Sequence, residues 1–212
     1  MPRYLMPVFL AVALPVFAQV PVIIDEIGEL EGVRDPKCYA TASRLEDFIY
    51  GTPLESEARF EKIALQKAWI RAVWAKASAG NPKEIGAEAL RPVLQASVPY
   101  TLMPDGSFVV GGTVVTARDK RQYGSVAYAL RAILAVQQDA LTDGTVLAPL
   151  SADAVELFKE AIDLTTLAAL QRADQASRKA NHDRIQPATL KSAWKEVAGS
   201  GGAAAASAAQ KN

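Results

Sequence analysis

Few side chains in this 212-residue sequence have the type and spacing that catalysis requires. His182 is the only histidine and Asp183 follows it, so the two could act as a general base and its orienting carboxylate. No nucleophile motif accompanies the pair, and His182 falls at the polar, basic end of an expected helix, where backbone carbonyls favour a cation. We therefore interpret His182 as an exposed residue at a helix end and assign no catalytic residue.

Metal and cofactor chemistry has no motif in this sequence either. One cysteine, Cys38, and one histidine are too few for a zinc site of the usual His and Cys type. The sequence has no CxxCH motif for attached haem, no glycine-rich phosphate loop and no G-x-S-x-G motif. Gly111 and Gly112 are better explained as a kink between short strands than as a ligand cradle. The sequence predicts no cofactor and no metal.

A basic loop and several aromatic residues could instead bind a macromolecule. Arg178, Lys179 and Arg184 could contact nucleic-acid phosphates, but 23 basic residues are balanced by 23 acidic ones, and a near-neutral surface disfavours nucleic acid. Exposed aromatic rings are typical anchors for a protein partner, although core packing is the alternative for each tryptophan. The candidate partner-binding residues are Trp69, Trp194, Tyr100 and Phe108.

The amino terminus predicts export. Residues 1–18 contain Arg3, then an uncharged run of thirteen residues, Leu5–Phe17, and then Ala18 before a cut at Gln19. This order is typical of a secretory signal peptide. The alternative is a retained membrane anchor, but the run is shorter than the roughly 20 residues that span a bilayer. We therefore expect a periplasmic or extracellular protein after cleavage.

Residues 19–38 form the expected N-terminal arm. The arm opens with the strand-like residues 20–24 and continues with an acidic segment that ends at Asp35-Pro36. Cys38 lies too far from Gln19 to be a lipid-modified first residue. It could be a small buried hydrophobe, or it could form an intermolecular disulfide or thioether in an oxidising compartment.

Apolar spacing divides the rest of the chain into two helical units, so the expected fold class is mainly α. In the first unit, residues 39–98, a short helix leads to a capping box at 52–55, then to a long helix that we expect to be central and buried. In the second unit, residues 125–198, Ser151 is expected to cap a long helix that runs to about residue 180. Residues 199–212 are rich in Gly, Ala and Ser and are predicted to be a flexible tail.

A small β insert separates the two units. Residues 99–124 predict a β-hairpin with a tight turn, a third short strand, and a solvated link at residues 118–121. Two or three strands are enough for a lip but not for an independent sheet domain. Asp105, Arg118 and Tyr123 could line a pocket there, which would make the protein a small enzyme.

The second helical unit echoes the first, which predicts an internal duplication. The matched positions lie in the same order along both units and are separated by 96 to 100 residues. They are Pro53-Leu54 with Pro149-Leu150, Ile85 with Ile185, and Leu90 with Leu190.

The run from Ser177 to Ala193 resembles the end of the histone fold, where a long helix leads to an Arg-Ile loop and a final helix begins with proline. The resemblance implies a tandem histone-fold doublet, with the two units paired head to tail over roughly 150 of the 212 residues. DNA binding does not follow from it, because the matching loop of the first unit has only Lys83, next to Glu84.

Three hypotheses about function remain open. The first is an exported, non-enzymatic module that binds another protein, or itself, in the cell envelope. The second is a histone-like DNA-binding protein whose leader has been misread. The third is a small enzyme with its pocket at the β insert.

Overall fold

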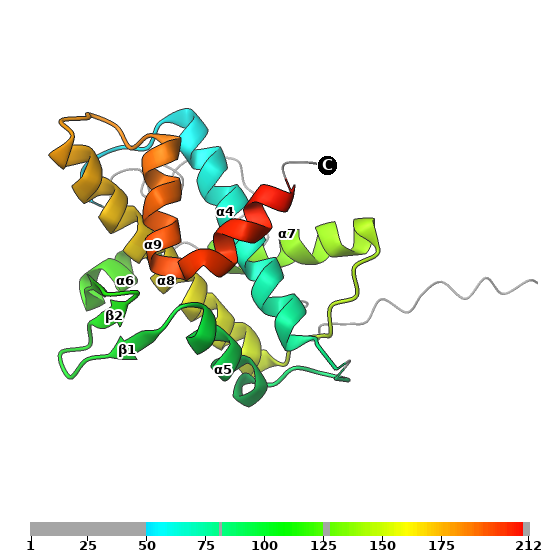
Figure 1. The fold of residues 1–212 in the computed structure, drawn as a ribbon. Coiled ribbons are helices and arrows are strands. Elements are labelled where there is room, and N and C mark those ends of the chain that lie inside the picture. Colours follow the sequence, from blue (N-terminus) through cyan, green and yellow to red (C-terminus); the bar gives the residue numbers. More distant parts are fainter. Residues whose placement is uncertain (1–49, 81, 125–127, 210–212) are drawn as a thin grey trace, which may run out of the picture.

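The structure of the chain is a computed structural model that describes residues 50–80, 82–124 and 128–209. Within these ranges the protein is mainly helical and carries one small antiparallel sheet, as the sequence predicts (Figure 1). The predicted signal peptide, the arm at 19–38 with Cys38, and the short helix expected from residue 39 lie outside the described residues.

The described elements follow one another in a simple order. Two helices come first, then three short strands, and then four helices. Their bounds are α4 (Ser56–Ala77), α5 (Ala87–Ser97), β1 (Tyr100–Leu102), β2 (Phe108–Val110), β3 (Thr113–Val115), α6 (Ala117–Gly124), α7 (Tyr128–Asp143), α8 (Ala152–Lys179) and α9 (Pro187–Ala209).

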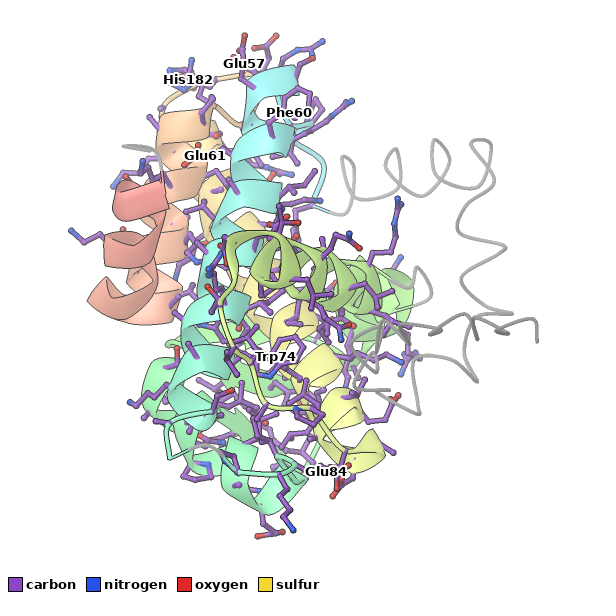
Figure 2. The ribbon with its side chains drawn as sticks, turned by 90° about the vertical axis from the view of Figure 1, so that its right-hand side faces the viewer. Glu57, Phe60, Glu61, Trp74, Glu84 and His182 are labelled. Carbon is purple, nitrogen blue, oxygen red and sulfur yellow. The ribbon has the colours of Figure 1, made fainter. Side chains whose placement is uncertain are left out.

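Helix α8 is the central element of the fold. Of its 28 residues, 16 are buried, and every other described helix, together with β2 and β3, packs against it. Helix α4 packs mainly on α9 and α7, and it leaves Phe60 73% and Ile63 42% exposed. Figure 2 shows Phe60 on the outside of α4. The expectation that the first long helix is central and buried is therefore wrong: α8 is the central element, and α4 buries only part of its surface. Its apolar side chains are spread around the axis, so burying one face leaves others in solvent.

Two parallel backbone bridges join the loops at opposite ends of the long helices. At one end, Ile185 N–H donates to Pro53 O (2.8 Å) and Glu55 N–H donates to Ile185 O (3.0 Å). At the other end, Ile85 N–H donates to Pro149 O (2.8 Å) and Ser151 N–H donates to Ile85 O (3.0 Å). The loop before each long helix is thus bonded to the loop after the other one.

These bridges change how both long helices begin. The predicted capping box at 52–55 is wrong: α4 begins at Ser56, and its N-cap residue Glu55 makes no side-chain cap hydrogen bond. Helix α8 begins where predicted, with Ser151 as N-cap residue, but the Ser151 hydroxyl lies 3.1 Å from Ile85 O instead of capping the helix. The backbone of each loop is hydrogen-bonded in a bridge, so each helix begins only after the bridged residues.

The predicted hairpin and third strand form a sheet of order β1-β2-β3, with Val109 opposite both Thr101 and Val114. The link expected at 118–121 is wrong, because these residues lie in α6. Thr116 and Asp119 form a reciprocal cap, in which Thr116 N–H donates to the Asp119 carboxylate (3.2 Å) and Asp119 N–H donates to the Thr116 hydroxyl (3.1 Å).

The C-terminal segment also differs from the prediction. Helix α9 bends at Gly199, whose φ of 67° is not helical, and residues 200–209 continue as a helix where a flexible tail was expected. Alanine has the highest helix propensity, and this segment is alanine-rich. None of the helices in the described residues is long and apolar enough to cross a membrane.

Candidate functional site

Two of the four candidate partner-binding aromatics are core residues. Trp69 and Trp194 are each 1% exposed. The Trp69 indole N–H donates to the Ser97 hydroxyl (2.9 Å), and its ring centroid lies 6.0 Å from that of Phe158. The expectation that these two rings anchor a partner from the surface is therefore wrong. Both rings belong to one hydrophobic core, and large aromatic side chains usually fill such a core.

The other two candidates, Tyr100 and Phe108, lie on the inner face of the sheet. Cross-strand partners point to the same side, and Tyr100 stands opposite the buried Val110. Phe108 is only 7% exposed, and the Lys120 ammonium lies 4.5 Å from its ring centroid. Phe108 is therefore covered, whereas Tyr100 is half-buried.

The opposite side of the sheet is the exposed one. Val114 is 51% exposed, and Val109 and Thr101 share its side by register. Met103 continues the pairing, because its N–H donates to Ser107 O (2.8 Å). It lies two residues after Thr101 and so faces the same side, and it is 40% exposed. We call these four uncharged residues, Thr101, Met103, Val109 and Val114, the outer sheet face.

Aromatic content alone could not have found the outer sheet face. Residues 108–110 are all apolar, so the sequence does not show which side of β2 is buried. Only the pairing register separates Val109 from Phe108 and Val110. The signal that could have helped is the alternation in β3, where Thr113 and Val115 are buried and Val114 is not.

Arg172 on α8 ties the sheet to the helical body. Its Nε donates to the Thr113 hydroxyl (2.5 Å), and one terminal nitrogen donates to Gly111 O (3.0 Å). The other terminal nitrogen donates to the Glu196 carboxylate on α9 (2.7 Å). One guanidinium therefore holds the β2–β3 turn and two helices together, and its planar set of donors suits this task.

Gly111 brings the β2–β3 turn against α9. Its φ is +52°, and a Cβ at this position would lie 2.7 Å from Val197 O and 2.9 Å from Val197 Cα. Gly112 is also left-handed, with φ +77°, but a Cβ there would meet only the Arg172 side chain, at 3.4 Å. Only the first position needs glycine for close backbone contact as well as for its conformation.

We therefore expect Gly111→Ala to cost more stability than Gly112→Ala. Both variants carry the strain of a positive φ, about 1 kcal/mol, but Gly111→Ala must also push the sheet off α9, for a total of roughly 2–4 kcal/mol. Urea unfolding measures the difference, and hydrogen exchange at residues 99–115 should accelerate only in Gly111→Ala. Equal losses in the two variants would show that the sheet is not seated on α9.

A cluster of charged side chains lies where α6 meets α8. Lys120 forms an ion pair with Glu160 beneath the sheet. Burial raises the pKa of the neighbouring Asp163 to about 7, Lys159 and Lys120 oppose this rise, and Glu160 adds to it. The folded protein therefore binds a proton at Asp163 that an unfolded chain releases near pH 4.

This cluster predicts a pH-dependent stability. Because the folded-state pKa of Asp163 is raised, the free energy of unfolding decreases as the pH increases from about 4 to about 7. Above that range the loss of stability stays constant. Asp163→Asn should then raise the melting temperature by roughly 3–6 °C at pH 8 and by little at pH 4. The exposed Asp183→Asn is the matched control. Calorimetry measures the melting temperatures of both variants at pH 4 and pH 8. An equal effect of Asp163→Asn at the two pH values would refute the raised pKa of Asp163.

The predicted basic loop is partly used for structure. Arg178 Nε donates to the buried Asp174 carboxylate (3.1 Å), which also accepts from Thr52 N–H (3.1 Å), and an Arg178 terminal nitrogen donates to Tyr50 O. Lys179 and Arg184 are exposed. Arg178 thus braces the loop before α4.

The charges at the two ends of the long helices are mixed. At the Ile185 end, exposed Lys179 and Arg184 are accompanied by exposed Asp183 and Glu57. Figure 2 shows Glu57 at the same end of the molecule as His182. At the opposite end, the last turn of α4 carries exposed Lys76, the following loop carries exposed Lys83 and Glu84, and α5 and α8 begin with exposed Glu88 and Asp153. A phosphate backbone binds to clustered positive charge, and neither end supplies it.

Asp105, one of the residues expected to line a pocket at the insert, has a structural role. Asp105 accepts from Ser107 N–H (2.9 Å) and from the Ser107 hydroxyl (2.6 Å), so its carboxylate closes the hairpin turn, and these bonds lower its pKa. Arg118 is exposed, and the Tyr123 side chain lies outside the described residues. His182 is exposed, as expected for a helix end. Among the described residues, no group of His, Cys, Asp or Glu could hold a metal ion.

Comparison with protein-family models, with curated proteins and with solved structures finds no match to this chain.

Proposed function

We propose that the chain is an exported, non-enzymatic module that binds another protein through the outer sheet face. Its scaffold is a tandem pair of helical units, joined head to tail in the manner of a histone-fold doublet. The binding surface belongs to the insert between the units, and the long helices serve to hold it.

The crossed loop bridges support this scaffold. Pro53, Leu54 and Glu55 meet Ile185 with the same two hydrogen bonds that join Pro149, Leu150 and Ser151 to Ile85. These are the positions that the sequence matches between its two halves. Two units that exchange the same contacts, each with the other, are what head-to-tail pairing requires.

The observation that carries the binding role is an uncharged surface held rigidly. Val114 and Met103 expose apolar side chains beside Val109, although a folded protein usually mixes charge into its surface. The Arg172 hydrogen bonds and the Gly111 contact with α9 fix the sheet before any partner arrives. A preorganised surface loses little entropy on binding, which favours affinity.

The mixed charges at the helix ends favour this role over DNA binding. Arg178 is engaged by Asp174, and exposed carboxylates accompany the exposed lysines at the Ile85 end. Electrostatic contacts with phosphates supply most of the affinity of non-specific DNA binding. The same fold can serve unrelated functions, so the scaffold alone does not argue for DNA.

We predict that Val114→Glu abolishes partner binding while Val146→Glu does not. Both valines are exposed, 51% and 84%, so both variants should fold, but only Val114 lies on the outer sheet face. The purified protein is immobilised, incubated with an envelope extract of its source, and the retained proteins are quantified. A protein kept by the wild type and by Val146→Glu but reduced roughly tenfold or more by Val114→Glu is expected. Equal retention by all three would contradict the proposed surface.

Export has its own test. After cell fractionation, N-terminal sequencing of the native protein should recover a chain that starts at Gln19 in the periplasmic or extracellular fraction. A chain that retains Arg3 and sediments with the nucleoid would refute export and would favour the histone-like alternative.

A further inference from the structure

Strand β1 is an edge of the sheet, and its outward backbone groups can be assigned from the ladder. Gly111 N–H donates to Pro99 O (3.0 Å) and Met103 N–H donates to Ser107 O (2.8 Å). Hydrogen-bonded pairs alternate in an antiparallel ladder, so Thr101 also bonds across to β2. The N–H and C=O groups of Tyr100 and Leu102 therefore point away from the sheet.

The side chain of Gln95 occupies half of this edge. Its amide oxygen accepts from Tyr100 N–H (3.4 Å), and its amide nitrogen donates to Tyr100 O (3.2 Å). These two bonds satisfy the outward N–H and C=O of Tyr100, as a neighbouring strand would, but those of no other residue of β1. Leu102 has no such cover in the part of the chain that the structure describes, and its side chain is 62% exposed. The edge is thus open at one backbone pair beside an apolar side chain, a position that natural proteins usually protect.

We propose that residues 20–24 of this same chain add to β1 as a fourth strand. The new strand would bond to the N–H and C=O of Leu102, displace the Gln95 amide from Tyr100, and cover the Leu102 side chain. This pairing does not depend on whether the outer sheet face binds a partner.

The composition of residues 20–24 suits this edge. Val20, Val22, Ile23 and Ile24 are β-branched, which favours a strand, and Pro21 is tolerated where its missing N–H faces the new outer edge. From residue 24 to Tyr50 the chain can extend over roughly 90 Å, which exceeds the width of a domain of this size. The linked segment also has a high effective concentration at its own edge.

The test compares two substitutions at one edge residue in the full-length chain. Leu102→Pro removes the outward N–H without touching the bonds to β2, and Leu102→Ala shortens the same side chain but keeps the N–H. Hydrogen exchange of residues 20–24 is measured in the wild type and both variants, with exchange in α8 as the check that each has folded. We expect residues 20–24 to be protected in the wild type and in Leu102→Ala, and to exchange about tenfold faster in Leu102→Pro.

Two results would overturn the proposal. The first is unprotected exchange of residues 20–24 in the wild type, or equal protection in the proline and alanine variants. The second is protection that falls on dilution together with a dimer in native mass spectrometry, because the strand would then come from a second copy. Protection that is independent of concentration and lost only in Leu102→Pro supports pairing within one chain.

Discussion

The hydrogen bonds of Ile85 and Ile185 constrain the rest of the described structure. Each isoleucine lies in the loop that follows one long helix, and its backbone joins the loop that precedes the other. Both side chains are almost completely buried, so these bonds lie in apolar surroundings, where an unmade bond costs about 1–3 kcal/mol. The bridges fix both ends of α4 relative to α8. Helices α5 and α9 begin directly after the bridged isoleucines, so their starting points are fixed as well.

The position of the β insert depends on the helices that these bridges hold in place. Its sheet packs on α8 through β2 and β3, and Arg172 and Gly111 connect the β2–β3 turn to α8 and α9. Polar and charged groups surround the attachment: Glu196 neutralises Arg172, and Glu160 pairs with Lys120 beneath Phe108. These charged side chains therefore lie on the inner side of the sheet, where they attach it to the helices. The four residues of the outer sheet face are uncharged. This division explains how a small sheet can expose valine and methionine and still be firmly placed.

Local patterns predicted most elements of the fold but not the contacts between them. Helical spacing and the glycine and proline positions were sufficient for α4, α5, α7, α8 and the hairpin. Helix α6 follows the Thr116–Asp119 cap, but its charged residues lack the apolar spacing that indicates a helix. The 52–55 capping signal does not start a helix, because a distant loop bonds to that backbone. The candidate site was harder. Whether Trp69 is core or surface, and which side Val114 faces, depends on partners far away in the sequence.

The loop bridges have a consequence for the order in which the chain can fold. Leu54 and Ile185 are 131 residues apart (185 − 54), so the loop before α4 cannot find its partner until nearly the whole chain is available. Contacts of such long range close slowly, because the entropy of loop closure is lost before the contact contributes. The loop before α4 therefore lacks its bridge to Ile185 during most of synthesis. The native topology can therefore be completed only after residue 185 has been synthesised.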